Sequence, residues 1–145
     1  MLDLEKIKEA FELLDSWERY EYVIDLGKKM PMIPDALKDE AHKVPGCLSQ
    51  VWLDISLDEK NRLQFRGDSD ASTVKGLVAI ITSLFAGKTP EEALALKPVE
   101  ILNDLNLDAQ ISMNRQTGIA SMIRTIQNFC LHQLGRSPLP MPAHT

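Results

Sequence analysis

A cysteine in a Pro-Gly loop is the residue of this chain best suited to chemistry. Cys47 follows Pro45 and Gly46 and precedes a run of residues that alternates like a strand. Proline fixes φ and glycine tolerates positive φ, so the pair can form a tight turn that presents a thiol to a partner. A cysteine is also among the residues most often buried as inert apolar side chains. The loop by itself therefore leaves two interpretations of Cys47 open.

The other cysteine and the histidines form no recognisable catalytic or metal-binding pattern. Cys130 lies on the apolar stripe of an expected helix, which predicts a core residue. His42 lies five residues before Cys47, but catalytic triads are built in space and sequence order does not identify a base. A structural zinc site needs about four ligands at short paired spacings, which these residues lack. We therefore expect no bound metal.

Two carboxylates precede an expected helix that begins near Ala71. Asp68 and Asp70 could in principle hold a cation. Carboxylates at the start of a helix more often accept hydrogen bonds from its first N–H groups and are favoured there by the helix dipole. We therefore predict that these side chains cap the helix.

Length and composition indicate one domain with thiols in a reducing compartment. The chain has 145 residues, 44% of them hydrophobic, which is enough for a single core. It has two cysteines and opens without the layout of a secretory signal, so we expect a cytoplasmic protein. The net charge of −5 argues against nucleic acid as a partner. No apolar run approaches the roughly 18 residues of a membrane span, so we expect no membrane association.

The spacing of apolar residues predicts helices at both ends of the chain. Helical periodicity covers residues 4–14 and 16–27, and Asp15 with Glu18 forms a plausible capping box for the second of these. Further helices are expected over residues 71–87, after Thr89, over residues 98–105, and in a last segment that Gly135 ends. Residues 31–43 contain two prolines and no clear period, which predicts a loop with at most one helical turn.

The middle of the chain predicts a small antiparallel sheet. Residues 50–57 alternate with a period of two, and Leu63 with Phe65 continues the alternation after a polar turn, as in a hairpin. Val44 is expected to add a short third strand. The predicted fold class is therefore α+β, with a sheet of about three strands flanked by helices. We expect one domain over residues 1–136 and an extended proline-rich tail over residues 137–145.

The ordered motifs resemble those of the SufE sulfur-acceptor family. The resemblance rests on Gly46-Cys47-x-Ser49-x-Val51-Trp52, on Gly67-Asp68-Ser69-Asp70-Ala71 with Val74-Lys75-Gly76-Leu77, on Trp17-Glu18-Arg19-Tyr20 with Leu26-Gly27, and on Asn114-Arg115-Gln116-Thr117-Gly118. It extends from about Leu4 to Leu134, nearly the whole domain. The set of motifs in this order is far more specific than any single motif.

The resemblance implies a fold like those of SufE and IscU and a role in sulfur transfer. A SufE-like protein would dock on a PLP-dependent cysteine desulfurase of SufS or CsdA type and take sulfur from the persulfide of that enzyme onto Cys47. It would stimulate the desulfurase and pass the sulfur to an iron–sulfur scaffold complex of SufBCD type. The PLP belongs to the partner, so this chain is expected to carry no cofactor. Such a chain is a persulfide relay and activator and not a stand-alone enzyme.

The resemblance also implies roles for residues near Cys47. Gly46 would permit the tight loop, and Ser49 and Gln50 would orient the cysteine. Asp70 and Arg115 match positions near the loop and the desulfurase interface, although a helix cap or a local ion pair explains each of these two equally well.

Two other functions remain open. An iron–sulfur scaffold of IscU type would need about three or four ligands, mostly cysteines, and the loop offers one. A regulatory domain that binds a desulfurase without chemistry would leave Cys47 inert.

Overall fold

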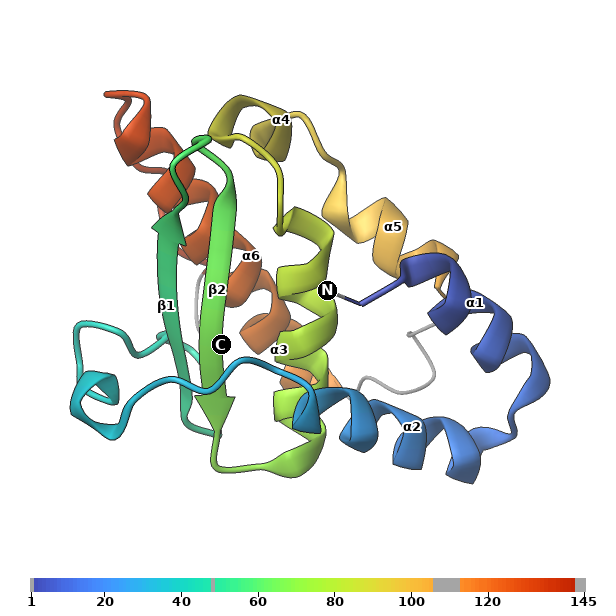
Figure 1. Cartoon of the computed structure of the whole chain (residues 1–145). Helices are drawn as coiled ribbons and strands as arrows, with labels where there is room; N and C mark the ends of the chain where they lie inside the picture. The colour runs from blue at the N-terminus through green and yellow to red at the C-terminus, as the bar shows by residue number, and fades with distance from the viewer. Residues whose placement is uncertain (1, 48, 106–112, 143–145) are drawn as a thin grey trace.

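The computed structural model shows helices around a β-hairpin, which confirms the predicted α+β class (Figure 1). It describes residues 2–47, 49–105 and 113–142, with residues 113–117 described by their main chain alone. In chain order the elements are α1 (Leu4–Leu13), α2 (Ser16–Lys28), the 3-10 helix η1 (Asp35–Leu37), β1 (Val51–Leu57), β2 (Leu63–Ser69), α3 (Ser72–Phe85), α4 (Pro90–Leu94), α5 (Pro98–Asp104) and α6 (Met113–Gln133). None of the described helices is long and apolar enough to cross a membrane.

Side-chain caps determine where the first helices begin. Asp3 accepts hydrogen bonds from the first turn of α1. The predicted capping box at α2 is present, because Asp15 accepts from the N–H of Glu18 and the Glu18 side chain accepts from the N–H of Asp15. Thr89 and Glu92 form the same reciprocal pair at α4. These caps satisfy N–H groups that the helices themselves leave without partners.

The hairpin is antiparallel, and its register pairs Val51 with Ser69 and Leu57 with Leu63. The prediction of a third strand at Val44 is wrong. The N–H of Val44 donates to the carbonyl of Val51 at 2.8 Å, but only an isolated bridge forms at this edge of β1. Pro45 has no N–H to extend the pairing, and Gly46 turns the chain away with a φ of 83°.

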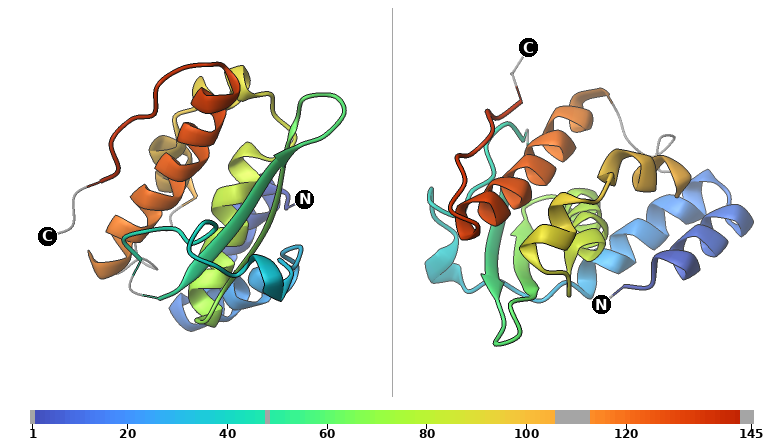
Figure 2. Two further views of the ribbon diagram at one scale, coloured as in Figure 1. Left: turned by 90° about the vertical axis from the view of Figure 1, so that its left-hand side faces the viewer. Right: turned by 90° about the horizontal axis from the view of Figure 1, so that it is seen from above.

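Helices α3 and α6 lie on one side of the hairpin (Figures 1 and 2). The segment between η1 and β1 runs along the outer edge of β1, where Val44 and His42 hydrogen-bond to the strand. Helix α3 is buried along most of its length, and α2 contacts it so closely that a Cβ added to Gly76 would lie 2.0 Å from the carbonyl oxygen of Val23. The core includes Ile7, Phe11, Val23, Leu26, Val51, Leu53, Leu63, Phe65, Leu77, Ile81, Phe85, Met122, Ile126 and Cys130.

The described part of the tail, residues 137–142, runs back along α6 (Figure 2). Gly135 reverses the chain with a φ of 70°. The side chain of Asn128 then donates to the carbonyl of Leu139 at 2.9 Å and accepts from its N–H at 2.8 Å. Arg124 donates to the carbonyl of Pro140 at 3.4 Å. The tail is therefore fastened to the helix through its main chain.

Replacing Gly76 by alanine is expected to destabilise the fold strongly. The added Cβ collides with the backbone of Val23, so α2 and α3 must move apart, which costs about 2–3 kcal/mol of unfolding free energy or more. Urea denaturation measures the loss. Ser72→Ala, at an exposed position of the same helix, serves as the control and should change stability by about 0.5 kcal/mol at most. An unchanged urea midpoint for Gly76→Ala would contradict the close approach of the two helices.

Candidate functional site

The Cys47 thiol rests against the main chain of α6. The side chain is half-buried, and its Sγ lies 3.8 Å from the carbonyl oxygen of Gly118, to which the thiol donates a weak hydrogen bond. A Cβ built on Gly118 would come within 3.2 Å of the same sulfur. Gly46 precedes the cysteine with a φ of 83°, in the left-handed region that favours glycine. The loop therefore directs the sulfur inward in this structure.

Burial raises the pKa of the Cys47 thiol. Removal from water disfavours the charged thiolate, and a thiol that donates to a carbonyl is stabilised in its protonated form. Near neutral pH this position therefore holds the thiol and suppresses its nucleophilicity. The sulfur becomes a strong nucleophile only if it leaves this environment or gains a cationic neighbour.

Cys130 is the buried core residue that the sequence predicts. Its side chain is fully buried in α6, and burial together with the negative charge of Glu91 raises its pKa to about 11. Glu91 belongs to α4, which packs against α6. Cys130 is therefore chemically inert at neutral pH and serves as packing.

Asp70 fastens the base of the Cys47 loop instead of capping α3. Its Oδ1 accepts from the N–H of Gln50 at 3.0 Å, and its own N–H donates to the carbonyl of Gln50 at 3.3 Å. The prediction that Asp70 caps α3 is therefore wrong: the N-cap is Ala71, which makes no side-chain cap. The cause is the hairpin register, which pairs Val51 with Ser69 and so places Asp70 opposite Gln50.

Asp68 does not cap α3 either, because it lies within β2 and pairs with two lysines. Lys38 lies 2.8 Å from one carboxylate oxygen and Lys75 lies 3.4 Å from the other. Partial burial alone would raise the pKa of Asp68, but the hydrogen bond from Lys38 and further contacts outweigh it and hold the pKa below its usual range. Lys38 also lies 5.7 Å from the centre of the Trp52 ring. These contacts attach the segment that follows η1 to the hairpin.

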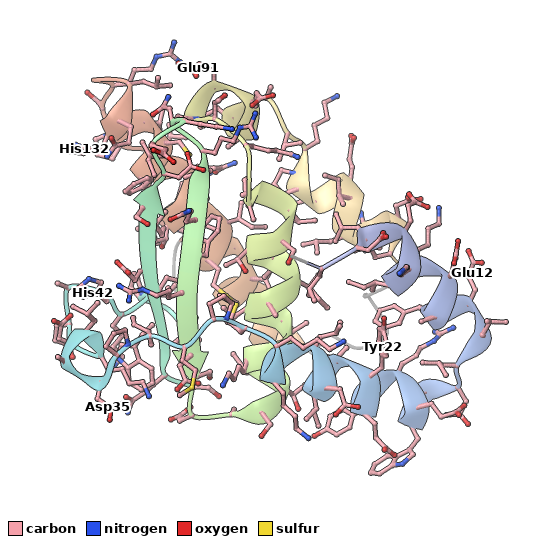
Figure 3. All side chains as sticks on the ribbon, viewed as in Figure 1. Glu12, Tyr22, Asp35, His42, Glu91 and His132 are labelled. Atoms are coloured by element: carbon pink, nitrogen blue, oxygen red, sulfur yellow. The ribbon has the colours of Figure 1, made fainter. Side chains whose placement is uncertain are left out.

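His42 faces carboxylates on the outer side of the hairpin. Its Nδ1 lies 2.7 Å from Asp39 and its Nε2 lies 4.0 Å from Asp54. Figure 3 shows His42 on the segment that passes outside β1. His42 is therefore engaged with carboxylates and is not placed as a base for Cys47.

The structure brings most of the candidate residues together at one end of the hairpin. Gly46 shapes the turn, and Gln50 is held by Asp70. Ser49 is half-buried beside them, and its side chain makes no hydrogen bond to another described residue. Arg115 lies in the first turns of α6, and its side chain is outside the described part of the structure. In the described ranges no three metal-binding side chains gather into a possible site.

Gly118 is the neighbour of Cys47 that sequence reasoning missed as a site residue. It lies 71 positions further along the chain and contacts the cysteine through its main chain. The only signal was its place in the motif that begins at Asn114, which carries no information about what it touches.

Comparisons with known proteins find matches over most of the chain. The family model SufE, described as an Fe-S metabolism associated domain, matches residues 5–130. An uncharacterized SufE-like protein of Rhizobium meliloti is 41% identical over 132 residues, which cover 88% of this chain and 94% of that protein. The sulfur acceptor protein CsdE of Escherichia coli is 36% identical over 123 residues, 84% of each chain.

A solved structure shares the fold. The solution structure of a hypothetical protein from Thermus thermophilus matches with a TM-score of 0.72 and covers 91% of this chain and 96% of its own. Its sequence identity is 19%, so this likeness concerns the arrangement of helices and hairpin.

The reaction of Cys47 with iodoacetamide is expected to have an elevated pH midpoint. Burial raises the pKa of the thiol, so the reactive thiolate appears only at higher pH than in free cysteine. Site-resolved mass spectrometry of alkylation from about pH 7 to pH 11 measures the midpoint. The same chain unfolded in urea is the reference and should titrate at lower pH. A folded midpoint at or below that of the unfolded chain would contradict the buried position of the sulfur.

Asp70→Ala is expected to loosen the base of the loop. The substitution removes the acceptor for the N–H of Gln50, which costs about 0.5–1.5 kcal/mol and exposes that amide to exchange. Hydrogen exchange of the Gln50 amide, followed by NMR, reports the change. Asp70→Asn retains a side-chain oxygen and should keep more of the protection. Equal exchange rates in wild type and Asp70→Ala would show that this hydrogen bond does not hold the loop.

Proposed function

Since the chain belongs to the SufE family, we propose that it is a sulfur acceptor whose Cys47 takes sulfur from a PLP-dependent cysteine desulfurase. The observation that supports this best is the position of Cys47, a partly shielded thiol directly after a glycine turn. The similarity to the sulfur acceptor protein CsdE supports a sulfur-acceptor role, and the region that the family model matches includes the Cys47 loop.

The transfer is a thiol–persulfide exchange. The Cys47 thiolate attacks the outer sulfur of the persulfide on the desulfurase, and a new S–S bond forms as the old one breaks. The desulfurase cysteine leaves as a thiolate with the electron pair of the broken bond. The proton that Cys47 loses goes to solvent or to a group of the partner, and Cys47 becomes the persulfide. The PLP that releases sulfur from cysteine is the partner's, and this chain supplies the nucleophile.

The geometry around Cys47 suits a carrier that must be protected between partners. A persulfide is attacked by small thiols and oxidants, and partial burial of the side chain limits their access. The turn at Gly46 gives the loop a point about which the sulfur can turn outward for exchange. In the proposal, Asp70 holds the base of the loop through Gln50, Ser49 helps to orient the cysteine, and Arg115 belongs to the partner interface.

The proposal includes two further steps. Docking of the chain stimulates the desulfurase, because removal of sulfur from its persulfide frees the enzyme for another cycle. The persulfide on Cys47 is then passed to an iron–sulfur scaffold complex by a second exchange of the same kind. A regulatory domain with an inert Cys47 would stimulate without carrying sulfur.

Sulfur acceptance is tested by mass spectrometry after incubation with a cysteine desulfurase and cysteine. We expect an added mass of roughly 32 Da, one sulfur atom, on the peptide that contains Cys47. Cys47→Ser should lose the added mass, whereas Cys130→Ser, which removes the buried thiol, should keep it.

Two results would overturn the proposal. One is the absence of added sulfur with several desulfurases, and the other is sulfur found only on Cys130. Stimulation of the desulfurase that survives in Cys47→Ser would identify the chain as a regulatory domain.

A further inference from the structure

We propose that Gly118 is a positioning residue for Cys47, and that its missing side chain and its carbonyl together keep the sulfur inward and protonated until the loop moves. The inference depends on the proposed function only for its biological use, since the contact itself is a property of this chain. It assigns a role to a helix position 71 residues away from the cysteine.

Gly118 constrains the position of the Cys47 sulfur by its lack of a side chain. A Cβ built on Gly118 lies 3.2 Å from Sγ of Cys47 but 3.7 Å from both Cα and Cβ of the same residue. Contacts between non-bonded heavy atoms are favourable at about 3.5–4.0 Å, so the two carbon contacts are ordinary and only the sulfur is too close. A single methyl group at position 118 would therefore displace the sulfur and little else.

The carbonyl of Gly118 also disfavours a negative charge on the Cys47 sulfur. The thiol donates to the carbonyl oxygen of Gly118, with Sγ and O separated by 3.8 Å. A thiolate at the same place would put two negative atoms face to face in a poorly solvated position, which disfavours ionisation. Burial already raises the pKa of this thiol, and the carbonyl acts in the same direction. The contact thus keeps the sulfur protonated and weakly nucleophilic while it points inward.

The loop, and not the helix, is the part that yields when this contact is crowded. Helix α6 is buried next to Gly118 at Ile119, Ser121 and Met122, so a shift of its backbone would disturb the core. On the other side of the contact, Pro45 is exposed and Gly46 is partly exposed. An added methyl group at position 118 is therefore expected to push the Cys47 sulfur outward.

Helix propensity disfavours a glycine at position 118. It lies inside the 21-residue helix α6, where glycine stabilises a helix less than alanine does. Nothing in the helix itself requires a glycine here, because its φ is not in the left-handed region. The neighbouring sulfur accounts for the choice.

The test is Gly118→Ala, assayed by site-resolved alkylation of Cys47 with iodoacetamide and without any desulfurase. We expect the rate at neutral pH to rise by roughly three- to tenfold, because more of the sulfur is exposed and ionised. We also expect the pH midpoint of the reaction to move toward that of the unfolded chain. A purely structural role for Gly118 would leave this pH profile in place. Ala120→Gly, at an exposed position of the same helix, is the control and should leave both quantities unchanged.

A double-mutant cycle on thermal stability keeps the test valid if the single variant folds poorly. In a Cys47→Ala background the sulfur is gone, so Gly118→Ala should raise the Tm through its better helix propensity. With Cys47 present the same substitution should raise the Tm less or lower it. Equal effects in the two backgrounds, or an unchanged alkylation profile, would overturn the role of Gly118.

The two proposals can fail separately. Loss of sulfur acceptance in the desulfurase experiment would overturn the sulfur-acceptor function and leave the alkylation result intact. An unchanged alkylation profile in Gly118→Ala would overturn the positioning role and leave sulfur acceptance intact.

Discussion

The near-contact of two helix backbones is the constraint on which the rest of this structure depends. Gly27 in α2 and Gly76 in α3 meet so closely that a Cβ on Gly27 would lie 2.7 Å from the backbone nitrogen of Gly76. Helix α3 is thereby fixed at the centre, with the hairpin and α6 packed against it. The residues that lead into α3 include Asp70, which holds the base of the cysteine loop. A packing contact without chemistry thus helps to set the position of the half-buried Cys47 thiol.

Features that depend on neighbours in the sequence could be predicted, and features that depend on strand register could not. The capping box at Asp15, the helix after Thr89 and the hairpin followed from short-range patterns. The caps expected from Asp68 and Asp70 were wrong, because a carboxylate takes whichever donor the tertiary structure brings to it. For Asp70 that donor is Gln50, twenty residues away, and the hairpin register alone places it there.

The candidate site likewise contains features that the sequence predicts and features that it does not. The turn of Pro45 and Gly46 marks Cys47 as unusual from the sequence, and Cys130 is recognisable as a core residue from its place in an apolar stripe. The resting direction of the Cys47 sulfur was not predictable, since it depends on a helix from the far end of the chain. The contact at Gly118 is harder still, because a residue that acts by having no side chain leaves no hydrophobic or charge pattern.

The tail fastened along α6 has a mechanical consequence for the cysteine. Bonds from Asn128 and Arg124 to the tail brace α6 on one side, while its buried face is anchored in the core. The tail and the core therefore hold α6 from two sides. The cysteine loop is held at one end by the hydrogen bond between Val44 and Val51 and at the other end by Asp70. The sulfur can therefore move outward only as far as the short segment between these two hydrogen bonds allows, so a partner must approach it closely.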